Sequence, residues 1–400
     1  ELERGIIDTT FNFAFLLGDK AKSPTLDTAG IANSESWYID INNISILNTK
    51  FNYEDSLTGT LLNSNIPALN LDISQFDLNN KKIYVQSLKF IEPDIIFTKT
   101  KNTKKTNSKE FVLDIPFFIY AQNVAIENAK FNFKNYNDSA IYAKMAFNDI
   151  KAKEIDIDIS NTYLWKDSLS TKIDQLTLKE ESGFEIKQFN TKISLNNRNI
   201  LLDTLSLKTN RSIINTSAKL KYRSFEDFKN FGNRVRFTTT LSNTLIDPDD
   251  LKYFIDTKAL GIGGLFKIQG DITGRLNSIR AKNVKLFAGN RTKFEGNFSL
   301  NGLPEIKQTF ISFKMEEFVT DYKDLKYIHN KIPLPTNAKN LGTILFKGRF
   351  DGFYSDFVTY GEAETALGNI ETDINFKIDN SGIPAYSGNI KVKEFEIGQW

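Results

Sequence analysis

Pairs of carboxylates are the residues of this sequence whose spacing could support acid–base chemistry. Asp156 with Asp158, and the adjacent Glu180 and Glu181, could act as the two carboxylates of a glycosidase. However, residues 155–159 alternate isoleucine with aspartate, which predicts a β-strand with both aspartates on its solvent-facing side. The alternation therefore favours a structural strand, and we expect that the chain is not an enzyme.

Three further features could bind a metal or a nucleotide. Asp247, Asp249 and Asp250 could be calcium ligands, but no EF-hand spacing follows, and aspartates also favour the first turn of a helix. The segment Leu260–Gly264 is glycine-rich like a phosphate-binding loop, but strand-like alternation follows it instead of a helix. With no cysteine and a single histidine, His329, which we expect in a surface loop, the sequence predicts no metal, cofactor or nucleotide.

The charges are nearly balanced over the whole chain. Lys+Arg 51 against Asp+Glu 49 gives a net charge of +2, so the totals indicate no nucleic-acid partner. Lysines are concentrated only in a polar stretch, at positions 99, 101, 104, 105 and 109. This stretch is typical of a solvated loop, with contact to anionic lipid headgroups as the alternative.

Alternating apolar and polar residues recur along most of the chain, which predicts an all-β fold. Asn-Asn, Ser-Gly and Asn-Gly pairs separate the alternating segments and favour turns. We expect an antiparallel meander of strands about six to ten residues long. Such a sheet must twist and curve, so its apolar face either closes on itself as a dry core or stays open as a channel.

Two internal repeats indicate that one β unit was copied. Residues 38–53 align without a gap on residues 118–133, with apolar residues at matching alternate positions around an asparagine-containing break. Residues 270–276 are echoed more weakly by residues 348–354. We interpret the copied unit as hairpin-like, and we expect the copies to stack into an extended array.

Two short helices are expected within this array. Ser224–Asp227 has capping-box spacing, and Asp247–Pro248 is typical of a second helix start. The predicted organisation is a first β block over 1–110 that ends in the lysine-rich loop, a second over 111–223, a helical insertion over 224–260 and a third β block over 261–400. The sequence begins at Glu1 without a signal-like or membrane-spanning segment, so we expect an internal piece of a longer protein.

One phase of each predicted strand is apolar and would line the interior, while the intervening polar residues would face water. From alternation alone, a packed core is favoured over a ligand channel. The candidate lining residues are Ile39, Ile41, Ile44, Ile46, Val124, Ile126, Ile155, Ile157, Ile159, Ile193, Leu195, Leu205, Leu207, Phe266, Ile268, Ile311, Phe313, Phe376, Ile378, Ile390 and Val392.

The C-terminal third carries a long motif, residues 346–361 (FKGRFDGFYSDFVTYG), followed by residues 365–370 (TALGNI) and Asp373. Shorter motifs lie at residues 181–184, 302–304 and 395–398. Together they resemble the TamB family of translocation and assembly module proteins, in its Bacteroidota-type branch, over about residues 37 to 400.

This resemblance implies an AsmA-like, repeating β-groove fold with a long, taco-like curved antiparallel sheet. It implies a periplasmic protein, anchored in the inner membrane by a segment outside this sequence, that reaches the outer membrane. The implied function is phospholipid transport along the groove, support of outer-membrane protein assembly, or both. The implied partners are phospholipid and an Omp85-type outer-membrane barrel, TamA or a lipoprotein relative. The alternative from another class is a structural or adhesive β-solid with a dry core and no lipid.

Overall fold

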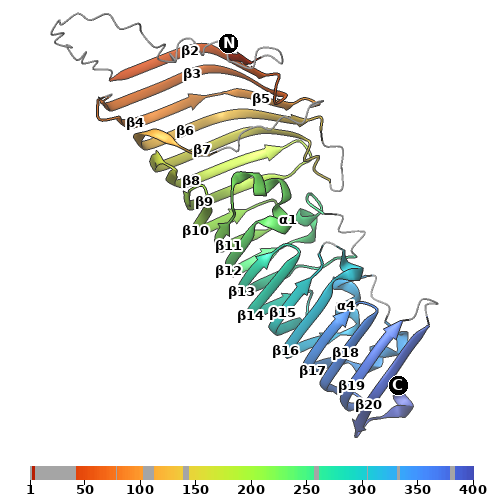
Figure 1. Ribbon diagram of the computed structural model, residues 1–400. Helices are drawn as coiled ribbons and strands as arrows, with labels where there is room; N and C mark the ends of the chain where they lie inside the picture. Colours follow the sequence, from red (N-terminus) through yellow and green to blue (C-terminus); the bar gives the residue numbers. More distant parts are fainter. Residues whose placement is uncertain are drawn as a thin grey trace, which may run out of the picture. The chain divides into compact units, whose positions relative to one another are not determined.

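The computed structural model describes residues 2–4, 42–77, 79–101, 112–137, 144–255, 261–303, 305–330, 334–378 and 383–400. These residues form an almost entirely β fold, as the alternation predicts (Figure 1). The chain divides into two compact units, of which the first contains Glu1–Ile141 and Met145–Glu185, and the second Tyr142–Lys144 and Ile186–Trp400.

The first unit is a sheet that contains parallel as well as antiparallel neighbours. Strand β6 is parallel to β4 and β5 but antiparallel to β7, and β1 is parallel to β2. Within its described residues the strands are β1 (Leu2–Arg4), β2 (Asn43–Asp55), β3 (Thr60–Asp77), β4 (Lys82–Ile91), β5 (Asp94–Lys99), β6 (Ile115–Asn135), β7 (Asp149–Lys166) and β8 (Ser168–Glu180).

The parallel pairs correct the predicted antiparallel meander. The lysine-rich stretch of residues 100–114 joins β5 to β6, and it is long enough for the crossover that parallel strands need. A meander, by contrast, has only short turns between neighbouring strands. Most of the stretch lies outside the described residues.

The sequence repeat places equivalent residues in β2 and β6, but each copy is one bent strand rather than a hairpin. Asn48 and Asn128, which align in the repeat, both adopt left-handed backbone conformations, with φ of 53° and 49°. An asparagine tolerates this conformation within a bulge as readily as within a turn. The strand therefore continues through the break, and β6 reaches 21 residues, far beyond the predicted strand length.

The second unit is an antiparallel sheet in which each described strand pairs with the next along the chain. Its strands are β9 (Glu185–Leu195), which begins at the last residue of the first unit, β10 (Asn199–Lys208), β11 (Ile213–Lys221), β12 (Arg236–Ile246), β13 (Phe266–Arg275), β14 (Ser278–Ala288), β15 (Thr292–Asn301), β16 (Phe310–Asp321), β17 (Thr343–Phe353), β18 (Asp356–Thr365), β19 (Gly368–Ile378) and β20 (Pro384–Lys393).

These strands form three successive groups of four, β9–β12, β13–β16 and β17–β20. Each group is followed by one helical turn or a short helix, and Gly270 and Gly348 of the weaker repeat lie in the equivalent strands β13 and β17. The helical elements are η2 (Phe225–Asn230), α1 (Phe231–Arg234), α2 (Pro248–Leu251), η3 (Ile306–Gln308), α4 (Tyr322–Ile328), η4 (Thr336–Leu341) and η5 (Ile397–Gln399).

The segment expected as a helical insertion contains a strand in its middle. Residues 236–246 form β12, where Phe237, Thr239 and Leu241 continue the apolar phase between two sheet neighbours. The helical parts on either side are short, and Ser224 begins η2 without the side-chain cap that its spacing predicts. His329, expected in a surface loop, is half-buried and forms a β-bridge to Ile262.

Two buried aspartates join helical turns to distant hairpin turns. Asp250 in α2 accepts hydrogen bonds from the backbone N–H groups of Arg211 (3.0 Å) and Ser212 (2.8 Å), between β10 and β11. Asp324 in α4 makes the equivalent contacts to the turn between β14 and β15. Each aspartate accepts hydrogen bonds from backbone N–H groups of its turn, including that of buried Ser212 or Thr292, so these helices hold the hairpins of the sheet in place.

Candidate functional site

One face of the first unit's sheet is apolar because the strand registers bring apolar residues together. Val124 lies opposite Ile159, and Ile126 lies opposite Ile157. Ala125, one residue away, lies opposite Asp158 on the other face. Since side chains alternate between the two faces of a sheet, this register separates an apolar face from a polar face.

The second unit has the same organisation, which continues over successive strands. Ile193 of β9 lies opposite Leu202 of β10, and Phe298, Phe313 and Phe350 lie opposite one another in β15, β16 and β17. The alternate phase carries the charges, as at Lys314 and Arg349. The apolar face of each unit is the candidate site.

The structure places the predicted lining residues as follows. Ile39 and Ile41 lie outside the described residues. Ile126, Ile155 and Ile157 pack together around Ala129 and Ala152, and Ile268 and Phe313 pack around Val284 in the second unit. The other predicted residues lie on the apolar face through strand register, namely Ile44, Ile46, Val124, Ile159, Ile193, Leu195, Leu205, Leu207, Phe266, Ile311, Phe376, Ile378, Ile390 and Val392. Their contact with lipid stays a prediction.

The polar residues of the opposite phase lie where the predicted register requires. Asp156, Asp158, Lys377 and Lys391 are all exposed. Lys377 and Lys391 form ion pairs with carboxylates of neighbouring strands on that face. These polar residues therefore lie on the face opposite to the apolar one, as predicted.

Bulges bend the strands toward their apolar face. Asn243 and Asn283 have φ of 46° and 53°, and the ladder register shifts at both positions. The residues that follow them on the apolar face, Thr244 and Val284, are 0% and 1% exposed, whereas Asn243 and Asn283 themselves are exposed. Side chains on the inside of a bend are shielded by both arms of the strand, so the apolar face is the concave one.

Small residues accompany these bends. Gly296 lies opposite Val284, and a Cβ atom added to it would come within 2.0 Å of the carbonyl oxygen of Lys314. Its φ of 153° also belongs to the region that favours glycine. A larger residue at this position would push β15 away from β16, so glycine allows the tight bend.

The apolar face is not sealed by a second layer. In the described part of the chain, the largest side chains below 2% exposure are valines and threonines, such as Val235 and Thr320. A few large apolar residues, such as Ile155 and Phe294, are buried, but many others are only half-buried, and some are well exposed, including Ile46 (41%) and Ile390 (60%). A dry sandwich core would bury phenylalanine, leucine and isoleucine completely, so this face retains apolar surface for another molecule.

A row of phenylalanines crosses this face in the second unit, and most of it was missed from the sequence. The ring centroid of Phe313 lies 5.7 Å from that of Phe294 and 6.5 Å from that of Phe350. The row continues to Phe357 and Phe376, with spacings of 4.7 and 4.9 Å. The missed residues occupy the same alternating phase as the predicted ones, so strand periodicity was the signal that could have found them.

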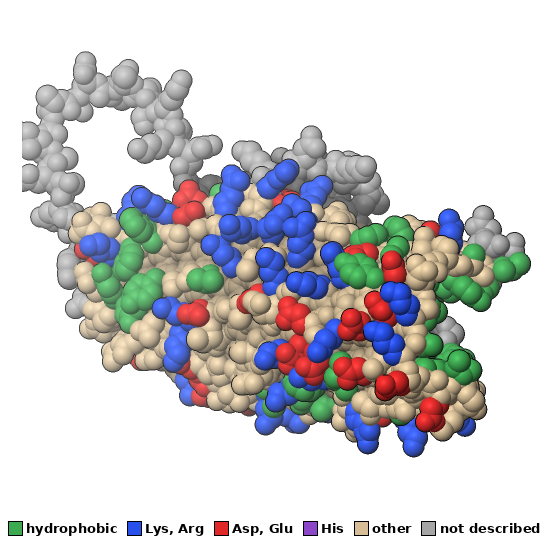
Figure 2. Space-filling view, turned by 90° about the horizontal axis from the view of Figure 1, so that it is seen from below, with side chains coloured by type: hydrophobic (Ala, Val, Ile, Leu, Met, Phe, Trp, Pro, Cys, Tyr) green, Lys and Arg blue, Asp and Glu red, His purple; other side chains and the backbone are tan. Residues whose placement is uncertain are grey.

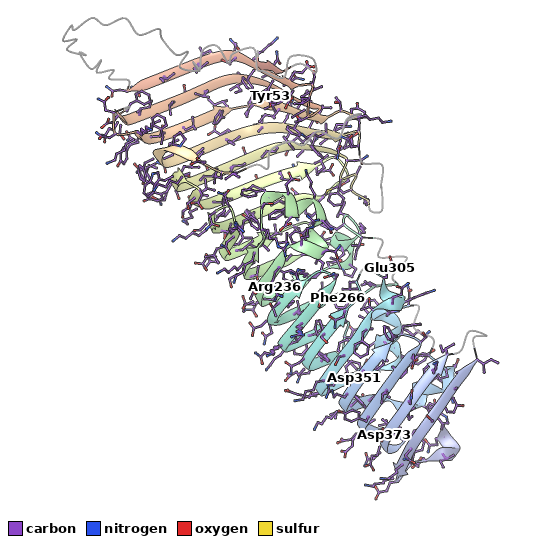
Figure 3. The ribbon with its side chains drawn as sticks, viewed as in Figure 1. Tyr53, Arg236, Phe266, Glu305, Asp351 and Asp373 are labelled. Atoms are coloured by element: carbon purple, nitrogen blue, oxygen red, sulfur yellow. The ribbon has the colours of Figure 1, made fainter. Side chains whose placement is uncertain are left out.

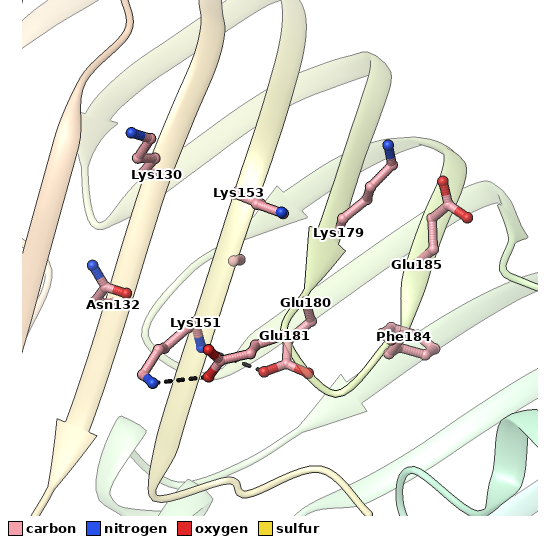
Figure 4. A pocket seen from close by; sticks show the side chains of 11 residues that line it. Lys130, Asn132, Lys151, Lys153, Lys179, Glu180, Glu181, Phe184 and Glu185 are labelled. Atoms are coloured by element: carbon pink, nitrogen blue, oxygen red, sulfur yellow. Dashed lines mark hydrogen bonds and ion pairs between the residues drawn. The ribbon is translucent and has the colours of Figure 1, made fainter.

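The candidate carboxylate pairs have other partners. Asp156 accepts a hydrogen bond from the N–H of Asn128 (2.8 Å), which supports the bulge of β6. Glu180 is buried and accepts from the N–H of Ser182 (2.7 Å) within its own turn. Glu181 pairs with Lys151 at 2.8 Å (Figure 4). Asp156, Glu180 and Glu181 therefore have local structural contacts, and Asp158 is exposed on the polar face.

A pocket of about 440 Å³ lies beside this turn in the first unit, and most of the residues that line it are charged (Figure 4). Lys130, Lys153 and Lys179 line it from three neighbouring strands. A hydrogen bond from Lys179 holds the pKa of Glu154 below its ordinary value. These charges suit the polar face and do not suit an acyl chain.

The aspartates considered for calcium also have protein partners. Arg211 contacts Asp249 at 2.6 Å, and Asp250 holds the β10–β11 turn. Burial works to raise the pKa of Asp250, but hydrogen bonds from Thr209, Arg211 and Ser212 outweigh it and lower the pKa. Within the described ranges, no three His, Asp or Glu side chains gather as metal ligands.

Comparison of the chain with protein-family models, with curated proteins and with solved structures finds no match. Across the part of the chain that the structure describes, no helix has the length and apolar character needed to cross a bilayer.

Proposed function

We propose that this protein carries phospholipid along the apolar concave faces of its sheet, between the inner and outer membranes of a cell envelope. The observation that carries the proposal is the apolar phase shared by successive strands within each unit, which is bent, concave and incompletely buried. Transfer of acyl groups from water is worth roughly 0.8 kcal/mol per CH₂, so a chain of ~16 carbons would favour this face strongly. The headgroup would remain in water.

The resemblance of residues 346–361 to the TamB family supports the cellular setting. It favours a periplasmic location, an inner-membrane anchor outside this sequence and an Omp85-type barrel as partner. On this basis we extend the proposal to support of outer-membrane protein assembly. The structural β-solid is the rival, but it needs a dry core, and the half-exposed phenylalanines and isoleucines do not favour one.

Native mass spectrometry of the protein purified from its own cells tests whether it carries lipid. We expect adducts with the masses of phospholipids, which dissociate under activation that leaves the chain intact. Replacing Lys314 by glutamine on the polar face serves as the control and should leave the adducts unchanged. Purified protein without phospholipid would favour the structural β-solid.

A further inference from the structure

A group of basic residues on the polar face of the second unit has no partner in the fold. This basic face consists of Lys219 and Lys221 of β11, Arg236 of β12, and Arg280 and Lys282 of β14. All five are exposed, and none has an ion pair or a side-chain hydrogen bond within the described residues. Figure 2 shows Lys and Arg side chains gathered over one part of the molecular surface, and Figure 3 labels Arg236.

Strand register brings these residues close together. Lys221 lies directly opposite Arg236, and the row Lys219, Thr238, Thr273, Arg280 runs across four adjacent strands. Like charges opposite one another in a sheet repel, so their gathering has no benefit for folding. Their arrangement therefore suits an anion outside the chain.

The nearest acidic side chain does not neutralise this group. Asp271 lies opposite Lys282 but accepts its hydrogen bonds from Thr240 (2.8 Å) and Asn283 (3.1 Å). Some other lysines of the same face are paired, as Lys293 is with Glu295 (2.9 Å) and Glu317 (3.1 Å). The positive potential over β11–β14 is therefore left for a partner.

The extent of the basic face indicates the kind of partner. Three strand spacings of ~4.8 Å and three rows of side chains ~7 Å apart span about 14 Å by 14 Å. This is well below the roughly 800 Å² per partner of a stable protein interface, and the basic face lacks the aromatic anchors of one. It has no aromatic platform for nucleic-acid bases either. Leu201, opposite Lys219 and 43% exposed, adds an apolar side chain at its border.

We propose that the basic face docks on the surface of a membrane rich in anionic phospholipid. The five cations would contact headgroup phosphates from neighbouring lipids. This contact lies on the face opposite to the acyl-binding one, and it requires no lipid in the groove. It would hold the second unit against a membrane surface.

Sedimentation with vesicles tests the docking surface. The intact chain should bind vesicles of phosphatidylcholine mixed with phosphatidylglycerol, and should not bind phosphatidylcholine alone. Since each basic residue contributes about fivefold to binding, the triple variant Lys221→Gln, Arg236→Gln, Arg280→Gln should bind on the order of a hundredfold more weakly. The matched triple Lys293→Gln, Lys377→Gln, Lys391→Gln, which removes as many charges from paired positions outside β11–β14, should change binding less than about threefold.

Further measurements distinguish membrane docking by the basic face from binding of another anion and from binding through the apolar face. Binding of Phe313→Arg to the mixed vesicles should be unchanged, because Phe313 lies on the apolar face. Loss of binding in Phe313→Arg but not in the basic-face triple would overturn the inference and leave the proposed function standing. Three other results would also overturn the inference. The first is equal binding to both vesicle types, and the second is an equal effect of the two triple variants. The third is displacement of the protein from the vesicles by inorganic phosphate or duplex DNA at constant ionic strength.

Discussion

Cells that carry Phe313→Arg in place of the natural protein are expected to lose envelope integrity as completely as cells without the protein. Phe313 lies in the middle of the phenylalanine row, between Phe298 and Phe350. An arginine there places a charge in the path of acyl chains, at a cost of several kcal/mol. Because the face is open, the guanidinium can reach water, so the chain should still fold. Detergent sensitivity of the cells measures the effect.

Two controls belong with this substitution. Phe313→Leu keeps an apolar lining and should retain most of the function, and Ser312→Arg adds the same charge to the polar face of β16 and should be tolerated. Full envelope integrity in folded Phe313→Arg would contradict transport along this face. Unfolding of Phe313→Arg alone would instead indicate a closed core.

Replacing Asp324 by asparagine is expected to destabilise the second unit by about 2–4 kcal/mol at neutral pH. The Asp324 side chain, 3% exposed as a residue, accepts from the N–H groups of Asn290 (2.9 Å), Arg291 (2.8 Å) and Thr292 (2.7 Å). An amide replaces one acceptor oxygen with a donor and leaves buried N–H groups without a partner. The shift of the urea midpoint measures the loss.

The same substitution should show a defined pH dependence. Burial works to raise the pKa of Asp324, but the hydrogen bonds from residues 290–292 outweigh it and place the pKa below the ordinary 3.8. A depressed folded-state pKa contributes stability above the unfolded-state pKa, and this contribution is lost as pH falls through the folded value. The difference between wild type and Asp324→Asn should therefore narrow below about pH 4. Asp373 is exposed, so the control variant Asp373→Asn should change the urea midpoint little at any pH. If the stability difference between wild type and Asp324→Asn stayed constant with pH, the ionised Asp324 carboxylate would not contribute to stability.

Alternation was sufficient to predict an all-β fold, but not the lengths or the pairing of its strands. Residues 155–159 lie in β7 with isoleucines and aspartates on opposite faces, as expected, because a two-residue period leaves no other arrangement in a half-buried strand. The alignment of Asn48 with Asn128 correctly predicted equivalent breaks in the two copies, but an asparagine suits a turn and a bulge equally. Local sequence could not separate those two outcomes.

Contacts between residues far apart in the chain could not be predicted from local sequence patterns. The parallel pairing of β5 with β6 depends on a crossover, which alternation does not encode. Asp250 was weighed as a calcium ligand or a first-turn helix residue, and its contact with the turn at Ser212 was missed because that turn lies 38 residues away. Charge totals also hid the basic face, since acidic residues elsewhere in the chain offset it.

Photo-crosslinking in living cells tests the central claim most directly. A crosslinking residue at position 157 or 313 lies on the apolar face, whereas the same residue at 158 or 314 lies one position away on the polar face. We predict that the probes at 157 and 313 capture phospholipid and that those at 158 and 314 do not. Equal capture at all four positions, or no capture at 157 and 313 in the folded protein, would contradict lipid transport along the apolar face.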